Sequence, residues 1–220
     1  MEIDESNAED LWVVPAVDLK SAFSRGGIKS SDIPMGPAGF AVGARYWESA
    51  ENIVSTCCDS IWKKSELEST VWCGGKYLDL VVGVLPSNSQ NKFLAKSNSS
   101  SIKLHIYHEI INAIESLTRQ VVKFASEREV EGGSLLSQSS IKALVAETLV
   151  CLSNSKRALS ALTGKNEEYQ LEPLRQLWLE LDDTIRKIGL LFGGRSVLEG
   201  GVISFRTHAM LIYKAYLHEE

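Results

Sequence analysis

The sequence predicts an all-α protein, a multi-helix bundle of five or six helices. Apolar residues recur at helical spacing in at least four long segments. Glycine and proline punctuate the chain between these segments, where helices would end. The chain is 44% hydrophobic and 23% charged, which is typical of a folded protein. At 220 residues it could be one domain or two halves joined by a loop rich in serine and asparagine.

The first 35 residues are expected to form a flexible acidic N-terminal arm, and residues 36–220 the helical domain. Five of the 28 acidic residues lie among the first ten positions, so the rest of the chain carries as many acidic as basic residues, 23 of each. A short helix is expected within the arm from Asp18 to Ser24, because Gly26 and Gly27 would end it.

From Gly39 to Lys64, large apolar residues recur every seven positions. Small residues alternate with them, as in a helix that packs closely against a second one. This spacing predicts a long amphipathic helix. The large residues are Phe40, Trp47, Val54 and Ile61.

Residues 66–85 allow two structures. The apolar spacing from Leu67 to Leu85 fits a helix, which we favour, whereas Gly74-Gly75 could be the turn of a small β-hairpin near 71–82. An exposed loop or linker is expected at 86–101, where serine and asparagine dominate.

Four helices are expected after this loop. Each has an apolar stripe, and glycines would end the first three, with Gly164 after the second and Gly193-Gly194 after the third. Their expected ranges are 102–129, 137–163, 172–192 and 202–217.

Composition excludes several classes of protein. No segment is apolar for long enough to span a membrane, and no run of basic residues is long enough to neutralise a nucleic-acid backbone. The acidic N-terminus resembles neither a secretory signal nor a transit peptide, so the cytoplasm or nucleus is expected. Gly-rich phosphate-binding and hydrolase motifs are missing, so no catalytic residue and no cofactor is assigned.

His105, His108 and Glu109 form the densest group of possible metal ligands. The two histidines are three positions apart and would share one face of a helix. A zinc site normally needs a further protein ligand, and the zinc-protease pattern H-E-x-x-H is absent. We therefore favour polar residues on a helix surface, with a metal site as the alternative.

Three other residues are candidates for binding. Trp12 follows the acidic leader and could dock as a short peptide, and Trp47 lies on the apolar seam of the predicted helix. Arg195 follows Gly193-Gly194 in a turn that could surround an anion, although a simple helix end is the plainer interpretation. The acidic pair Asp182-Asp183 is interpreted as part of a solvated helix face.

The function expected from the sequence is a non-enzymatic protein-protein interaction module. Such an adaptor or complex subunit would bind another protein, or a second copy of itself, through helical grooves. One alternative is an enzyme whose site is assembled across helices around His105, His108 and Glu109. The other is a helical lipid- or membrane-surface-binding domain, which the lack of a basic helix face disfavours.

Overall fold

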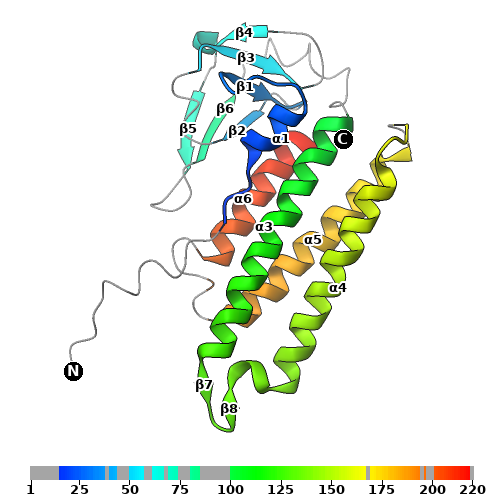
Figure 1. The fold of residues 1–220 in the computed structure, drawn as a ribbon. Coiled ribbons are helices and arrows are strands. Elements are labelled where there is room, and N and C mark those ends of the chain that lie inside the picture. The colour runs from blue at the N-terminus through cyan, green and yellow to red at the C-terminus, as the bar shows by residue number, and fades with distance from the viewer. Residues whose placement is uncertain are drawn as a thin grey trace, which may run out of the picture.

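The computed structural model shows a helical bundle with small β-sheets at one end (Figure 1). The structure describes residues 15–37, 40–43, 50–56, 61–66, 69–73, 80–84, 100–166, 169–193, 196 and 201–218. The prediction of a multi-helix bundle is confirmed, because five α-helices dominate this described part and its sheets are small.

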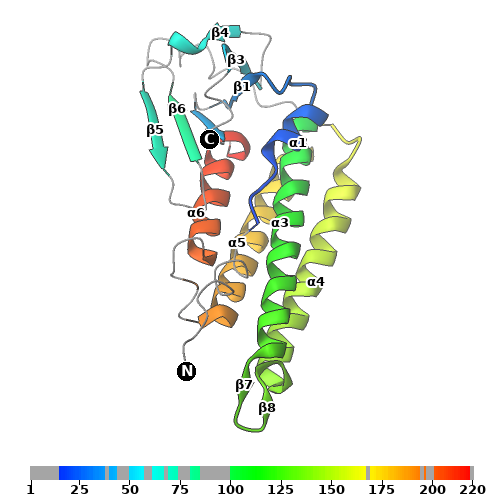
Figure 2. The same cartoon turned by 60° about the vertical axis from the view of Figure 1, so that its left-hand side comes forward.

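Four helices build the bundle, and a fifth, shorter one lies against it (Figure 2). The short helix α1 packs against the first half of α3, and α4 and α5 pack against α3 and each other. The last helix of the bundle is α6, which continues into one turn of π-helix, η7. The bounds are α1 Leu19–Arg25, α3 Ser100–Glu127, α4 Ser139–Leu162, α5 Leu171–Phe192, α6 Val202–Ile212 and η7 Tyr213–Leu217.

Two three-stranded sheets lie at the end of the bundle where α3 begins and η7 ends (Figure 1). One has the order β1-β3-β4, with β1 parallel to β3 and β4 antiparallel to it; the other is antiparallel, in the order β2-β6-β5. A two-stranded ribbon, β7-β8, joins α3 to α4. The strands are β1 Asp32–Met35, β2 Phe40–Gly43, β3 Asn52–Ser55, β4 Ile61–Lys63, β5 Ser69–Cys73, β6 Leu80–Val84, β7 Glu129–Val130 and β8 Gly133–Ser134; short 3-10 turns lie at Lys64–Glu66 and Leu135–Ser137.

Tyr216 in η7 joins the bundle to both sheets. Its fully buried hydroxyl oxygen accepts a hydrogen bond from the backbone amide of Val42 (2.8 Å) and lies 3.0 Å from the carbonyl oxygen of Pro34. Gly36 follows β1 at the same junction, where a Cβ atom would come within 1.8 Å of the carbonyl oxygen of Ala215. Only glycine fits at this position, and its lack of a side chain lets the sheet that contains β1 approach η7 closely.

The helix predicted over 39–64 is wrong. The described residues of this region form strands β2, β3 and β4 instead. Phe40, Val54 and Ile61 of the seven-residue spacing lie in three separate short strands. The β-branched Ile53 and Val54 favour a strand, and Gly43 disfavours a helix. The burial of β3 also has period two, since Ile53 and Ser55 are buried and Asn52 is exposed.

The helix favoured over 66–85 is also wrong, and the alternative hairpin is right. Strand β5 pairs antiparallel with β6, with Ser69 opposite Val84 and Cys73 opposite Leu80. Residues 74–79, which include the glycine pair, lie outside the described residues.

The first three of the four later helices agree with their predicted ranges to within about two residues, and the last, predicted over 202–217, is α6 followed by the π-helical η7. Gly164, predicted to stop a helix, follows α4 with a φ of 82°, a conformation that glycine adopts without steric cost. The short helix expected at Asp18 to Ser24 is present as α1, and the Asp18 carboxylate accepts a hydrogen bond from the backbone amide of Ser21.

Packing begins before residue 35, where the predicted N-terminal arm would end. Val17, Leu19 and Phe23 belong to the main core, and β1 contributes the buried Ile33 and Met35. Residues 1–14 and most of the predicted linker at 86–101 lie outside the described residues, so the proposed division into arm, domain and linker stays a prediction.

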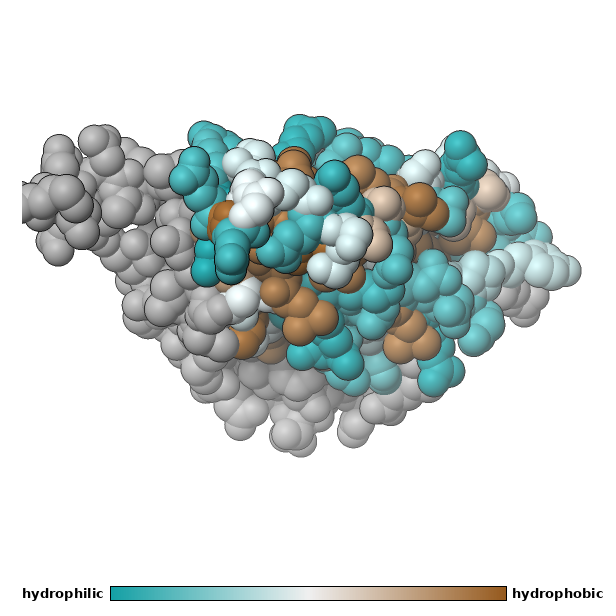
Figure 3. All heavy atoms as spheres, turned by 90° about the horizontal axis from the view of Figure 1, so that it is seen from below, coloured by the Kyte–Doolittle hydropathy of each residue, from teal (hydrophilic) through white to brown (hydrophobic). Residues whose placement is uncertain are grey.

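In the described part of the chain, no helix combines the length and apolar character needed to cross a membrane. Seen from the end opposite the sheets, the described surface is largely hydrophilic and is interrupted by hydrophobic patches (Figure 3).

Candidate functional site

A groove of about 770 Å³ lies between the first half of α3 and the last turns of α4, beside the end of α1. This volume is in the range of small-molecule sites, roughly 300 to 1,000 Å³. Its floor is aliphatic, built from Leu104, Ile111 and Leu159. Its polar lining residues are Arg25, Ser101, His105, His108, Asn112, Lys156, Ser160, Thr163 and Lys165. We call this cavity the α3–α4 groove.

Three basic side chains from different segments line the α3–α4 groove, and no Asp or Glu is among its described lining residues. Arg25, at the end of α1, donates to the carboxylate of Glu109 on α3. Lys156 on α4 donates to Glu115 on α3 (2.7 Å). This hydrogen bond from Lys156 lowers the pKa of Glu115 despite partial burial, so the carboxylate stays charged.

Both histidines predicted as candidates face this groove. Burial lowers the pKa of His105, and the positive charge of Arg25 and the neighbouring His108 lower it further. Burial also lowers the pKa of His108, with additional effects from Arg25 and Lys156. Because both pKa values lie below the ordinary 6.5, both rings are mainly neutral at pH 7.

The rim of the groove at the end of α4 is held by Gln170. This buried side chain donates to the carbonyl oxygens of Leu162 (3.0 Å) and Lys165 (2.7 Å), in the turn that follows the helix. The amide thereby neutralises carbonyl groups at the negative end of the α4 dipole. It also fixes the turn that carries Lys165.

A second, smaller cavity of about 470 Å³ lies at the start of α5 and the end of η7. The buried Lys103 lines it together with Arg175, Tyr213 and His218, but Glu172 lies there too. The α3–α4 groove is larger and has no acidic lining residue in the described part, so it is the stronger candidate site.

A third charged cluster is centred on a buried carboxylate. Asp182 on α5 accepts two hydrogen bonds from Arg206 (2.7 and 3.1 Å) and one from Arg186 (2.8 Å), and only 7% of it is exposed. The interpretation of Asp182 as part of a solvated face is therefore wrong. Burial raises the pKa of Asp182, but the hydrogen bonds and charges of the two arginines outweigh burial and hold it below its ordinary value.

Of the other predicted site residues, the structure describes only Glu109. Trp12, Trp47 and Arg195 lie outside the described residues. Glu109 adjoins His108, with 3.7 Å between Oε1 and Nδ1, but its carboxylate is engaged by Arg25. Among the residues that the structure describes, no group of three His, Cys, Asp or Glu side chains could hold a metal ion. A metal site at His105, His108 and Glu109 stays a prediction.

Sequence reasoning missed the basic residues that complete the groove. Arg25 lies 84 positions before Glu109, and Lys156 lies 41 positions after Glu115. No local spacing links residues so far apart. Only the pairing of α1 and α4 with α3 brings them to the two histidines.

No protein-family model and no curated protein matches the sequence. Among solved structures, one named an FAD-dependent dehydrogenase has a TM-score of 0.50 and 10% identity, with 83% of this chain and 60% of that chain covered. An acyl-CoA dehydrogenase from Slackia heliotrinireducens has a TM-score of 0.51 and 11% identity, with 94% of this chain and 68% of that chain covered. The chain thus spans about 60% to 68% of the length of these structures.

These likenesses overturn the prediction of a non-enzymatic adaptor or complex subunit that binds partners through helical grooves. Both of these solved structures are named as dehydrogenases, which are enzymes. Missing local motifs do not favour an adaptor over an enzyme, because a site assembled from distant residues leaves no such motif. At 10% to 11% identity the likeness shows the fold alone: the chain shares part of the fold of these two dehydrogenases.

Proposed function

We propose that this chain is the sheet-and-bundle part of a flavin-dependent oxidoreductase that acts on coenzyme A thioesters. The observation that carries the proposal is the likeness to an acyl-CoA dehydrogenase over 94% of the chain, which includes the sheets as well as the bundle. In such a reaction the acyl chain loses two electrons and two protons. FAD, when bound, supplies the acceptor for them.

The α3–α4 groove supports this proposal because its donors suit the ligand class. FAD and coenzyme A thioesters share an adenosine diphosphate moiety, whose diphosphate carries negative charge. Arg25, Lys156 and Lys165 would hold such a group, and the hydroxyl groups of Ser160 and Thr163 offer further donors. The aliphatic floor suits an acyl or pantetheine chain.

The first experiment is a titration of the purified chain with FAD and, separately, with acyl-CoA thioesters of short, medium and long chain. We expect FAD to bind at stoichiometric amounts, with a shift in its visible absorbance, and acyl-CoA to bleach that absorbance under anaerobic conditions. Riboflavin and free fatty acids serve as controls that lack the diphosphate. Binding of neither FAD nor acyl-CoA would contradict the proposed function.

We also propose that the chain acts with another protein or as a homo-oligomer, does not bind nucleic acid, and resides in the cytoplasm or nucleus. Exposed apolar side chains on α4 and α5 support an oligomer: Leu149, Val150, Leu179 and Leu190. Light scattering across a concentration series tests it, and a monomer at every concentration would contradict it.

A further inference from the structure

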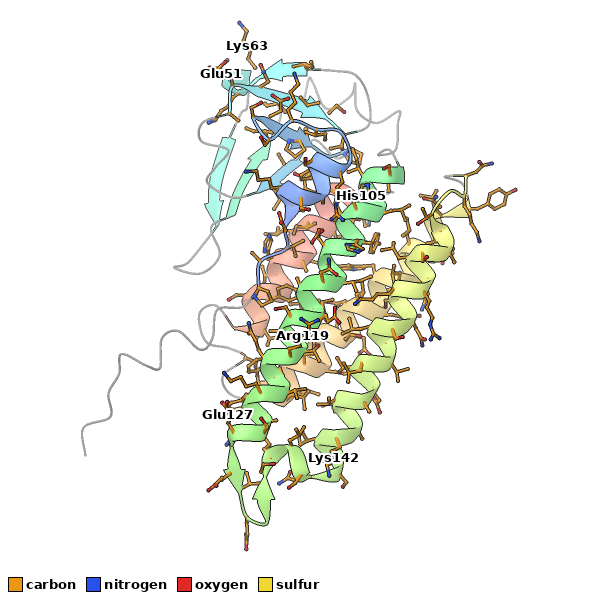
Figure 4. The ribbon with its side chains drawn as sticks, in the orientation of Figure 1. Glu51, Lys63, His105, Arg119, Glu127 and Lys142 are labelled. Carbon is orange, nitrogen blue, oxygen red and sulfur yellow. The ribbon has the colours of Figure 1, made fainter. Side chains whose placement is uncertain are left out.

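The basic residues of the α3–α4 groove are arranged around a common space. Arg25 comes from α1, the two histidines from α3, and Lys156 and Lys165 from α4 and the turn after it. In Figure 4, His105 lies in the upper part of α3, next to α1. Cationic and neutral donors that converge from three segments on one cavity are the arrangement expected of a site for an anion.

The helix ends beside the groove also favour a negatively charged ligand. Ser101 and Leu104 lie in the first turns of α3, a helix of 28 residues, whose N-terminal end carries partial positive charge. The opposing negative end of α4 is covered by the side-chain amide of Gln170. The dipole of α3 therefore adds to the charges of the basic side chains.

Protonation of the two imidazoles would add further positive charge to the groove. The charged groups around them are Arg25 on α1, Glu109 on the same helix, and Lys156 and Lys165 on the opposite side of the groove. Asn112 lies 3.0 Å from Nδ1 of His108. Burial disfavours the imidazolium form of both rings, Arg25 disfavours it further, and Lys156 adds to this effect at His108. A bound anion would favour that form, because opposite charges attract across the short distances of the groove.

We propose that the α3–α4 groove binds the diphosphate group of an ADP-containing ligand, and that His105 and His108 become protonated as it binds. The inference deepens the proposed function and rests on it for the ligand class, because FAD and coenzyme A both carry ADP. Lys156, Lys165 and Arg25 contribute positive charge to the groove. The histidines make the affinity depend on pH, and binding and proton uptake are reciprocal.

The test uses ADP-ribose, which contains the ADP moiety but neither a flavin nor a thioester. Its diphosphate is a diester, so the charge of this probe is constant between pH 6 and pH 8. Calorimetric titration of the full chain should show binding about tenfold tighter at pH 6 than at pH 8, with proton uptake visible as a dependence on the buffer. Binding that is equal at both pH values, or undetectable at millimolar ADP-ribose, would overturn the inference.

Variants assign the effect to the groove. His105→Asn combined with His108→Asn should remove the pH dependence, whereas His218→Asn, outside the groove, should leave it intact. Lys156→Met should weaken binding about fivefold at either pH. Lys142→Met is the matched control, because Lys142 lies on the same helix at its opposite end (Figure 4) and should not alter binding. Equal weakening by the two lysine variants would contradict a site in the groove.

Failure of this inference and failure of the proposed function are distinguishable. If ADP-ribose binds as described but acyl-CoA never bleaches bound FAD, the groove is supported and the oxidoreductase proposal is contradicted. If FAD and acyl-CoA react but neither Lys156→Met nor the double histidine variant changes ADP-ribose binding, the oxidoreductase proposal stands and the groove inference is contradicted.

Discussion

The α5–α6 cluster around Asp182 and the α3–α4 groove contain similar side chains in opposite settings. In the cluster, two arginines bind one buried carboxylate, and every contact lies within the bundle. In the groove, Arg25 and Lys156 each bind a carboxylate of α3 but also border a cavity. The difference lies in the cavity and not in exposure, since Arg186 is 61% exposed and Arg25 38%. We infer that an arginine or lysine paired with an acid is structural where it lines no cavity, and available to a ligand where it lines one.

The largest effect that separates the two regions is expected for Asp182→Ala. It would leave two arginines without their shared buried carboxylate and should lower the free energy of unfolding by about 2 to 4 kcal/mol. Chemical denaturation of the variant measures this loss. ADP-ribose affinity at a temperature where the variant is folded should stay unchanged, and a loss of affinity instead of stability would reverse the roles assigned to the two regions.

A second effect concerns His208, which is buried on α6 and whose Nδ1 has no hydrogen-bond partner among the described residues. Burial lowers its pKa to about 4. The unfolded chain therefore binds this proton from pH 6.5 downward, whereas the folded chain does not. The contribution of neutral His208 to the free energy of unfolding is therefore fully present above pH 6.5 and is lost as the pH falls to 4. The total loss is on the order of 3 kcal/mol.

Denaturation of wild type and His208→Leu at several pH values between 7 and 4 isolates this contribution. The variant should show a shallower decline in stability over the window, while the groove histidines keep their effect on ADP-ribose binding. Parallel declines for the two proteins would show that His208 is not the group responsible.

Glu109→Gln gives the smallest effect and the most specific one. Removing the carboxylate beside Arg25 should tighten ADP-ribose binding about two- to fivefold, because less negative charge lies at the groove. Stability should change by less than about 1 kcal/mol, since the pair is partly exposed and Gln can still accept a hydrogen bond. Calorimetry and denaturation of the same sample measure both quantities. Weaker binding would mean that Glu109 positions Arg25 for the ligand rather than competing with it.

The sequence predicted the bundle better than the sheets, for a physical reason. In α5, apolar residues from Leu174 to Leu191 repeat at helical spacing over many turns, so the pattern itself identifies the element. The strands of the two three-stranded sheets are only three to five residues long, too short for a period to be recognised, and their pairing depends on distant partners. The seven-residue spacing from Phe40 to Ile61 therefore imitated a helix.

The candidate site was predictable only where it is local. His105 and His108 could be paired from their spacing on one helix, and both line the groove. The residues that give the groove its charge, Arg25 and Lys156, join them through tertiary packing alone. Asp182 was misjudged because Arg206, its main partner, belongs to another helix.

The most direct test of this account is a crystal structure of the full chain grown with ADP-ribose. We expect the diphosphate in the α3–α4 groove, within hydrogen-bond distance of Lys156 Nζ and beside His105 and His108. A ligand in the smaller cavity next to Lys103, with the α3–α4 groove free of it, would contradict the assignment of the groove as the binding site.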